Sequence, residues 1–544
     1  MIPALVKTIL LVVALAAPAS AQTLRIAMAA ETDGADPHHF AMTPNSTLRD
    51  HVFEELVFSD PKSIVIPGLA TSWERLDDLT WRFNLRTTAR FSNGARFGAP
   101  DVVATFCRIL NNRDELGASF SPTVRRMTAV VAEGEDSVII RTAQPEPLLL
   151  TDLRGLAIIP RAATPPARMF DRPTSCGGGE GWPGIADFNA LKIPGTGPFR
   201  IASYTRSGTI VLNRNPHYDG PRPHWAEVRL TPLTQQAARL ASLLAGDQDV
   251  IEAPGTPDIP RLRTDPRFTV TSAPTLRLLF LQLDVARDPT PFVTGRNLLR
   301  DPRVRQALSL AIGRTALVDR IMDGNALPAT QYLPGNLPSD RSGTIPGAPI
   351  LPYDPARARA LLKEAGAEGM SLTLHATNNR YVNDGAIAQA IVQQWQRVGV
   401  KAAVDTMPAV TFFSRRSRRE LSVYMGGWAT PAPETLGFFR SWLTTTDEAR
   451  GVGSSNYGGW SDPEFDAPVA AAMATMDDVA RSRLLQKASA RALDQMPAIP
   501  LYFENAVWAT RAGLSYPGRT GEITIAQEIT EVPITEVPIT ELPK

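Results

Sequence analysis

The run Leu276-Arg-Leu-Leu-Phe-Leu-Gln-Leu283 is almost continuously apolar and lies between Pro274 and Asp288-Pro289. An apolar run of this length, bounded by turn residues, is typical of a strand that is buried on both faces. A second strand-like stretch, 498–511, begins with Ala-Ile-Pro-Leu-Tyr-Phe near the C-terminus. The chain before the first run is rich in expected strands, and the chain after it is rich in expected helices. This pattern predicts a mixed α/β fold with two lobes, an architecture that binding proteins and many enzymes share.

Hydrophobic periodicity predicts the individual elements around these two runs. The expected strands are 22–30, 80–85, 138–141, 209–212, 227–230, 371–376 and 421–427. The expected helices are one that begins at Pro100-Asp101 and those at 235–244, 302–312, 315–323, 354–365, 384–398 and 479–494.

Composition limits the class of protein. The 544 residues include 56 Lys and Arg against 55 Asp and Glu, so the chain lacks the basic surplus that nucleic-acid binding requires. Apolar residues make up 43% and charged residues 20%, which are ordinary values for a globular protein. These numbers exclude a nucleic-acid partner, a disordered chain and a polytopic membrane protein.

The N-terminus, residues 1–21, predicts a secretory signal peptide. Lys7 supplies the positive charge, Thr8–Ala17 is the apolar segment, and Ala19-Ser-Ala21 is a small-residue cleavage motif. The alternative is a membrane anchor or a buried first helix, but the run is shorter than the roughly 20 residues that span a bilayer. No cysteine stands at the cleavage motif, so we expect an exported, soluble, periplasmic protein that is not a lipoprotein.

The chain has two cysteines, Cys107 and Cys176. An oxidising compartment permits them to form a disulfide, which would close a loop worth roughly 4 kcal/mol in the chain-entropy model. Two separate buried thiols remain the alternative, because the sequence contains no information on their distance.

Motifs for catalysis, cofactors and metals do not occur. The sequence contains no Walker P-loop, dinucleotide-binding glycine turn, His-Glu-x-x-His, Cys-x-x-Cys or Gly-x-Ser-x-Gly. The pair His38-His39 is a poor metal site, since adjacent residues of an extended segment point to opposite faces. We therefore expect no enzyme activity, no cofactor and no metal.

Several segments in fixed order resemble the extracellular solute-binding proteins, family 5, which are the large peptide-, dipeptide- and nickel-type receptors of ABC importers. The matching segments are Trp81–Arg86 with Phe91–Gly94 and Ala99–Val102, Gly195–Phe199, Leu212–Tyr218, Leu243–Asp249, Asp301–Leu308, Tyr353–Pro355 with Ala360–Gly366, and Gly427-Trp428. The resemblance covers about residues 23–515.

The resemblance implies a two-lobed periplasmic binding protein of type II, in the large cluster with an extra subdomain, whose lobes are joined by two hinge strands. Lobe I would comprise 22–274 plus 500–525 with a subdomain at about 50–190, and lobe II would comprise 275–499. The tail, 526–544, contains three copies of a pentapeptide that ends in proline. Proline at every fifth residue prevents regular structure, so we expect 526–544 to be disordered.

The resemblance also places ligand-contacting residues in the cleft, with Trp428 at the end of an expected strand. The further candidates are Thr430, Arg380, Asn378, Asn379, Asn456, Ser455, Phe412, Phe40 and Met42. Core packing is the alternative for Trp428 and Phe412, and a solvated loop charge is the alternative for Arg380.

One departure from the family concerns the ligand. Peptide-binding members have an Asp three residues after this Trp, where it holds the peptide's α-ammonium, but this chain has Pro431 there. Glu434 lies three residues further on. We therefore expect a peptide-like, opine-like or other small solute rather than an ordinary di- or oligopeptide.

The resulting hypothesis is a monomeric receptor that closes on its solute and delivers it to an inner-membrane ABC permease. The alternatives are an exported α/β hydrolase and a periplasmic binding or chaperone-like protein without a transport role.

Overall fold

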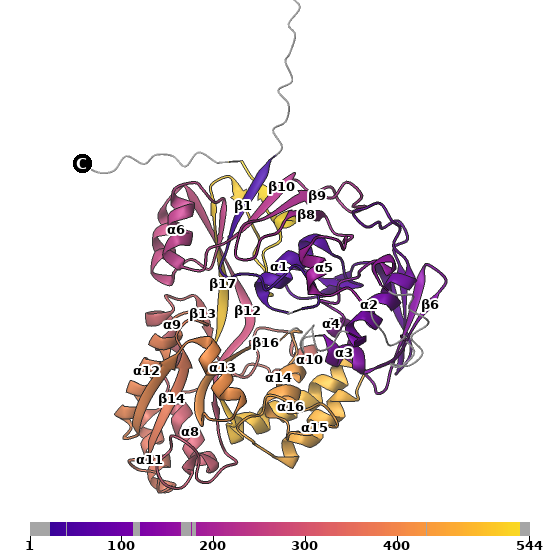
Figure 1. Ribbon diagram of the computed structural model, residues 1–544. Helices are drawn as coiled ribbons and strands as arrows, with labels where there is room; N and C mark the ends of the chain where they lie inside the picture. The colour runs from indigo at the N-terminus through magenta and orange to yellow at the C-terminus, as the bar shows by residue number, and fades with distance from the viewer. Residues whose placement is uncertain are drawn as a thin grey trace, which may run out of the picture.

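Two long strands connect the two ends of the molecule. The computed structural model describes residues 22–39, 41–111, 120–164, 176, 181–430 and 432–533. Strand β12 (Phe268–Leu283) pairs antiparallel with β17 (Ala498–Arg511), and both run from the upper lobe into the lower lobe in Figure 1. They are the middle strands of one sheet with the order β15-β14-β16-β12-β17-β11-β1-β10-β9-β8. The expectation of two α/β lobes joined by two strands is therefore confirmed.

The predicted lobe boundaries stay a proposal. Positions 274/275 and 499/500 both fall inside the crossing strands, and the register between β12 and β17 shifts between Pro274 and Leu278. A proline and a register shift interrupt the ladder at this point, where the chain passes between the lobes.

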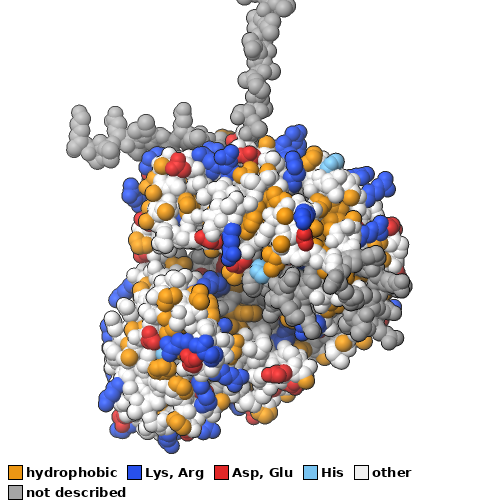
Figure 2. Space-filling view, in the orientation of Figure 1, with side chains coloured by type: hydrophobic (Ala, Val, Ile, Leu, Met, Phe, Trp, Pro, Cys, Tyr) orange, Lys and Arg blue, Asp and Glu red, His pale blue; other side chains and the backbone are white. Residues whose placement is uncertain are grey.

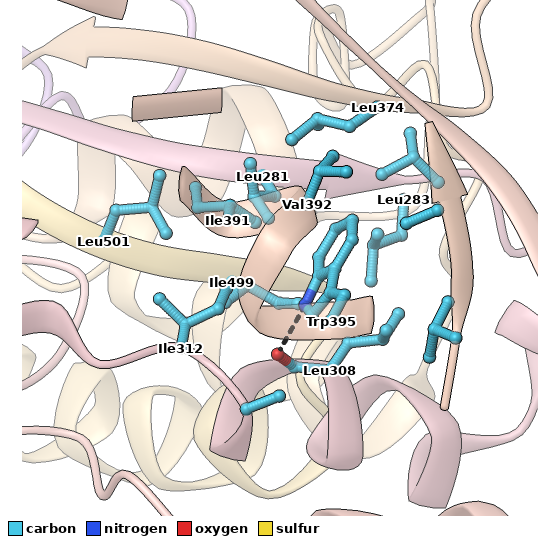
Figure 3. Close-up of a cluster of buried hydrophobic side chains, with 14 of the residues drawn as sticks. Leu281, Leu283, Leu308, Ile312, Leu374, Ile391, Val392, Trp395, Ile499 and Leu501 are labelled. Carbon is cyan, nitrogen blue, oxygen red and sulfur yellow. Dashed lines mark hydrogen bonds between the residues drawn. The ribbon is translucent and has the colours of Figure 1, made fainter. Parts of the chain in front are cut away.

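The lower lobe packs helices against β14 (Ser371–Thr377), β15 (Lys401–Met407) and β16 (Val423–Ala429). Its helices include α8 (Pro302–Leu310), α9 (Arg314–Ile321), α11 (Pro355–Glu364), α12 (Asp384–Arg397) and α16 (Asp478–Gln495). Figure 3 shows its core around Trp395, which is fully buried and donates its indole N–H to the carbonyl of Leu308 at 2.9 Å. Apolar side chains from β12, β14 and β17 meet those of α8 and α12 there.

The upper lobe contains the other half of the large sheet. Strand β1 (Thr23–Met28) pairs in parallel with β10 (Glu227–Pro232) and β11 (Val250–Glu252). The sheet continues through β9 (Ile210–Arg214) to β8 (Phe199–Ser203), and α6 (Gln236–Leu244) belongs to the same lobe in Figure 1.

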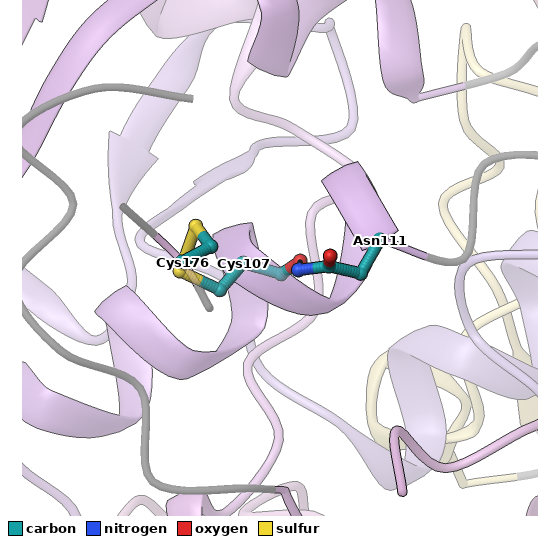
Figure 4. The surroundings of a disulfide bond; sticks show 3 residues. All are labelled: Cys107, Asn111 and Cys176. Atoms are coloured by element: carbon teal, nitrogen blue, oxygen red, sulfur yellow. Dashed lines mark hydrogen bonds between the residues drawn. A yellow bond between two sulfur atoms is a disulfide. The ribbon is translucent and has the colours of Figure 1, made fainter. Parts of the chain in front are cut away.

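A subdomain extends from the upper lobe around a four-stranded sheet with the order β4-β5-β7-β6. These strands are β4 (Ala70–Asp77), β5 (Thr80–Leu85), β7 (Ser137–Thr142) and β6 (Met127–Glu133). Its main helix, α2 (Ala99–Asn111), packs into the subdomain core together with Phe83, Phe91 and Cys176. Cys107 on α2 forms a disulfide with Cys176, at a Cα–Cα distance of 5.2 Å (Figure 4). The sequence alone left this pairing open.

The other strands and helices of the described residues have the following bounds. The strands are β2 (Val57–Ser59), β3 (Val65–Pro67), β13 (Ala326–Pro328), β18 (Leu514–Ser515) and β19 (Thr530–Glu531). The helices are α1 (Thr43–Val52), α3 (Ser121–Arg125), α4 (Leu149–Asp152), α5 (Ile185–Asn189), α7 (Ile259–Thr264), α10 (Ser339–Ser342), α13 (Ala409–Ser417), α14 (Leu436–Phe438) and α15 (Pro463–Met473). In the described part of the chain, no helix is both long enough and apolar enough to cross a bilayer.

The prediction of a disordered tail is wrong for its first residues. Ile529 is fully buried in the upper-lobe core, and its carbonyl accepts a hydrogen bond from the indole of Trp225 at 2.9 Å. The next residues, Thr530–Glu531, form β19 and pair with β18. The first repeat is ordered because its Ile fills an apolar site and its Thr-Glu pair extends a strand before the first proline. The other repeats, 534–544, and the expected signal peptide, 1–21, lie outside the described residues.

Candidate ligand-binding site

The candidate site lies where β16 meets the crossing strand β12. Trp428 is opposite Leu278 in this ladder, is half-buried, and packs edge-on against Trp442 with ring centroids 5.9 Å apart. Leu148 of the subdomain belongs to the same apolar cluster as these residues, so both halves of the molecule contribute to it. Figure 2 shows a hollow in the surface between the upper and lower-left parts of the molecule.

An arginine surrounded by aromatic rings lies beside Trp428. The guanidinium carbon of Arg416, on α13, is 4.8 Å from the ring centre of Phe413, 5.3 Å from Tyr457 and 5.6 Å from Trp442. These are cation–π distances, which stabilise the charge. Nε of Arg416 is buried and has no hydrogen-bond partner among the described residues. We call Arg416, Phe413, Trp442 and Tyr457 the aromatic cage.

Tyr381 is the point at which several cationic groups converge. Its side chain is buried, which raises its pKa, while the charges of Arg380, Arg277 and Arg416 oppose that rise. Its ring lies against Gly427, where a Cβ atom would come within 2.5 Å of it. Glycine at 427 therefore permits the ring to approach the backbone of β16 next to Trp428.

A charged cluster joins the two crossing strands at the same level. Arg277 on β12 donates two hydrogen bonds to Glu522, at 2.8 and 2.6 Å, and lies 3.8 Å from Glu504 on β17. Burial raises the pKa of Glu504 to about 7, although the charge of Arg277 opposes the rise. The Glu504 and Glu522 carboxylates raise the pKa of the Arg277 guanidinium against the effect of burial.

Glu434 is engaged elsewhere. Its carboxylate accepts two hydrogen bonds of 2.9 Å from Arg481 on α16, and both side chains are buried. A carboxylate held in this way has its acceptor sites directed at the guanidinium fork. Glu434 therefore does not replace the Asp that is missing at position 431, and residue 431 itself lies outside the described residues.

The loop predicted at 378–380 is exposed and lies at the end of β14. The side-chain oxygen of Asn379 accepts a hydrogen bond from the backbone N–H of Ala409 at 2.8 Å, at the start of α13. The Arg380 guanidinium lies 5.1 Å from the ring centre of Tyr381. Asn378 donates its backbone N–H to Met407 at 3.1 Å. The structure thus brings Arg380 and Trp428 to the same region through Tyr381.

Other predicted residues have structural roles in this conformation. Phe412 is fully buried in a small core with Met407 and Tyr424, as the packing alternative required. Asn456 is 2% exposed, and its amide donates to the carbonyls of Thr444 and Trp460. This geometry favours structural roles for Phe412 and Asn456 over direct contact with a ligand.

The last four candidates occupy varied positions. Thr430 is buried and donates to the carbonyl of Ala432 at 3.0 Å, whereas Ser455 is half-buried and its backbone N–H bonds Ser441. Met42 is 49% exposed at the N-terminus of α1. Phe40 lies outside the described residues.

Sequence reasoning missed Tyr381, Arg416 and Trp442. Arg416 belongs to the run Arg415-Arg416-Ser417-Arg418-Arg419, which is typical of a solvated surface. Trp442 lies fourteen residues after Trp428 in a segment without a clear period. Of these three, only Tyr381 could have been predicted from its position, because it directly follows the loop 378–380 that the sequence already placed at the site.

Comparison with known proteins agrees with this architecture. The profile of the bacterial extracellular solute-binding proteins, family 5 middle region, matches residues 65–450. The chain belongs to this family. It is 27% identical to the peptide transport periplasmic protein SapA of Salmonella typhimurium, over 84% of this chain and 82% of that protein. It is also 27% identical to the dipeptide-binding protein of Escherichia coli, over 90% of this chain and 91% of that protein.

The fold is likewise similar to solved structures. The periplasmic binding protein DppA of Helicobacter pylori, in complex with the peptide STSA, superposes with a TM-score of 0.73 at 19% identity, covering 94% of this chain and 98% of that one. At this identity the likeness concerns the fold. Members of the family are solute-binding proteins, and these comparisons do not support the hydrolase alternative.

Proposed function

We propose that this protein is the periplasmic receptor of an ABC importer, which captures a small solute between its lobes and presents it to an inner-membrane permease. The observation that carries this proposal is the site itself. Half-buried aromatic and cationic side chains gather at the level where β12 and β17 pass between the lobes. Apolar walls with a few directed polar groups are what an enclosed small-molecule site needs.

Binding in this proposal is a shift of population between open and closed arrangements of the lobes. The ligand stabilises the closed arrangement because it makes contacts with both lobes only there. Strands β12 and β17 would act as the hinge, since they are the paired strands that continue from one lobe into the other.

The residues proposed to contact the ligand are those that converge on Tyr381. Trp428 and Arg380 are kept from the sequence prediction, and Arg416, Trp442 and Tyr381 are added from the structure. Asn378 and Asn379 remain proposed because their loop is exposed beside Arg380. We infer no role in catalysis for any of them.

We also propose that residues 1–21 are removed on export and that the mature protein is a monomer without a lipid anchor. Intact-mass measurement of the periplasmic protein tests the first point. A mature chain that begins at Gln22 is expected, and a retained N-terminus or added lipid mass would contradict the proposal.

Two measurements test the receptor function. Native mass spectrometry of protein purified gently from the periplasm should show a small solute bound one to one, which is lost after denaturation and refolding. Small-angle X-ray scattering should then show a decrease in the radius of gyration when the extracted solute is returned. A solute that binds without closure, or closure that persists in Trp428→Ala as in the wild type, would contradict the proposed site.

A further inference from the structure

Three buried hydrogen-bond donors without acceptors lie on side chains of the proposed site. Within the described residues, Nε of Arg416 and the indole nitrogens of Trp428 and Trp442 are buried and have no hydrogen-bond partner. Trp442 is only 3% exposed. Such groups are rare in folded proteins, because each has lost its hydrogen bonds to water without replacement. The side chains are neighbours, with 5.9 Å between the centres of the two indole rings and 5.6 Å between the guanidinium carbon of Arg416 and the centre of the Trp442 ring.

The guanidinium of Arg416 carries the strongest of these unmet donors. In the described part of the chain its side chain forms no ion pair and no hydrogen bond, and its guanidinium lies within cation–π distance of the three rings of the aromatic cage. Arg415, the preceding residue, differs in this respect, since it lies 3.3 Å from Glu420 and 3.5 Å from Asp405. The two neighbouring arginines therefore differ in their ion pairs: Arg415 has carboxylate partners, and Arg416 has none among the described residues.

The carboxylates near the site are held by other cations. Glu434 is bound by Arg481, and both Glu504 and Glu522 face Arg277. Glu146, on the subdomain side, lies 2.9 Å from Arg126. Within the described residues neither Arg380 nor Arg416 forms an ion pair with these acids, and both charges act on Tyr381.

A ligand with an anionic group would satisfy this arrangement. A carboxylate offers about four acceptor sites in a plane, and it can accept the guanidinium N–H of Arg416 together with an indole N–H. A free ammonium group offers only donors, so it would face Arg416 and the two indoles without forming a hydrogen bond to them. The site therefore distinguishes ligands by the sign of the group that they present.

We propose that the ligand is a small organic acid whose carboxylate is bound by Arg416, Trp428 and Trp442, and that it needs no free α-ammonium group. Acylated amino acids, N-blocked peptides and sugar acids have this chemistry. The inference rests on the proposed receptor function and names the class of ligand that the receptor would take.

Matched probes test the charge requirement by isothermal titration calorimetry on the full mature chain. One set is built on alanyl-phenylalanine, as the free dipeptide, the N-acetyl acid, the C-terminal amide and the N-acetyl amide. A second set compares gluconate with glucitol. At least one probe with a carboxylate and no ammonium should bind, and its counterpart without the carboxylate should bind at least about tenfold more weakly.

Single substitutions test the assignment to Arg416. Arg416→Met keeps an apolar stem within the aromatic cage and should weaken binding of the acid about 10- to 150-fold, the range for a hydrogen bond to a charged group. Arg416→Lys keeps the charge without the fork and should recover only part of that loss. Arg415→Met is the matched control, and it should leave the affinity within about twofold. Circular dichroism verifies that each variant is folded.

The outcomes separate this inference from the receptor function. If neutral or cationic probes bind as tightly as the acids, or if Arg416→Met binds the acid as the wild type does, the inference is overturned while the receptor function stands. Absence of binding by every acid at 10 mM also overturns it. The receptor function fails separately, when gently purified protein carries no solute and no probe closes the lobes.

Discussion

Ionisation of Glu504 should make the free energy of unfolding depend on pH, and the substitution Glu504→Gln should remove this contribution. Its carboxylate lies on the crossing strand β17, is 8% exposed, and accepts a hydrogen bond from the backbone N–H of Val382 at 3.1 Å. Its nearest cation, Arg277, is already bound through two hydrogen bonds to Glu522. Burial therefore dominates and raises the pKa of Glu504 from 4.5 to about 7.

The sign of the effect follows from proton binding. Between pH 4.5 and 7 the native protein holds a proton on Glu504 that the unfolded chain has lost, so the free energy of unfolding falls as the pH rises through this interval. The contribution is complete below pH 4.5 and lost above pH 7. A pKa change of this size corresponds to roughly 3 kcal/mol.

Glu504→Gln mimics the protonated carboxyl group at every pH. Its amide oxygen can still accept from Val382, so we expect the variant to gain stability relative to the wild type by up to about 3 kcal/mol between pH 5 and pH 8. Urea unfolding at intervals of half a pH unit, followed by tryptophan fluorescence, measures the difference. Comparing the two proteins cancels the contributions of other titrating groups.

Glu522→Gln is the matched control. It removes the main partner of a buried guanidinium and should cost about 3 kcal/mol at pH 7. The charge of Glu522 helps to raise the pKa of Glu504, so the pH dependence should also shrink in this variant. If Glu504→Gln and the wild type differ by the same free energy at pH 5 and pH 8, the reasoning from burial is refuted.

Three further predictions concern stability, each measured by urea unfolding. Cys107→Ser opens a disulfide between residues 69 apart and should cost about 4 kcal/mol, an effect that reduction of the wild type should reproduce and whose absence would contradict the chain-entropy account. Trp395→Ala leaves a cavity and an unpaired Leu308 carbonyl, and should cost about 3–5 kcal/mol; a loss below 1 kcal/mol would show that the core collapses into the space. Glu434→Gln leaves the buried Arg481 with Asp478 as its remaining carboxylate partner and should cost about 3 kcal/mol; a loss below 1 kcal/mol would show that Asp478 is enough to hold the guanidinium.

Local pattern predicted most elements of the fold. Strands such as 80–85 and helices such as 384–398 carry their period in their own residues, and both occur within one residue of the expected limits. Helix α15 was missed because Pro468 stands inside it and its alanine-rich composition has little periodicity. Strand β15 was missed because only its pairing with β14 distinguishes it from a loop.

The candidate site was predicted less completely than the fold. The family resemblance named Trp428 and Arg380, which stay predictions, whereas Phe412 packs in a small core and the Asn456 amide bonds backbone carbonyls within its own loop. Arg416 is one of several neighbouring arginines with the same local surroundings in sequence. What distinguishes Arg416 is its contact with the rings of Trp442 and Tyr457, which are distant in the sequence. This contact depends on how α13 packs against the lobe.

The sequence by itself predicted two α/β lobes, because the apolar runs at 276–283 and 498–503 are typical of strands buried on both faces and separate a strand-rich from a helix-rich part of the chain. It also determined the family, through motifs in fixed order, and it raised the question of the ligand through Pro431. Tertiary structure decided that Cys107 and Cys176 are bonded, that Ile529 is core, and that Glu434 is unavailable to a ligand. The physical reason is that charges and hydrogen-bond donors acquire their roles from partners distant in the chain, whereas a strand or helix is encoded by its neighbours.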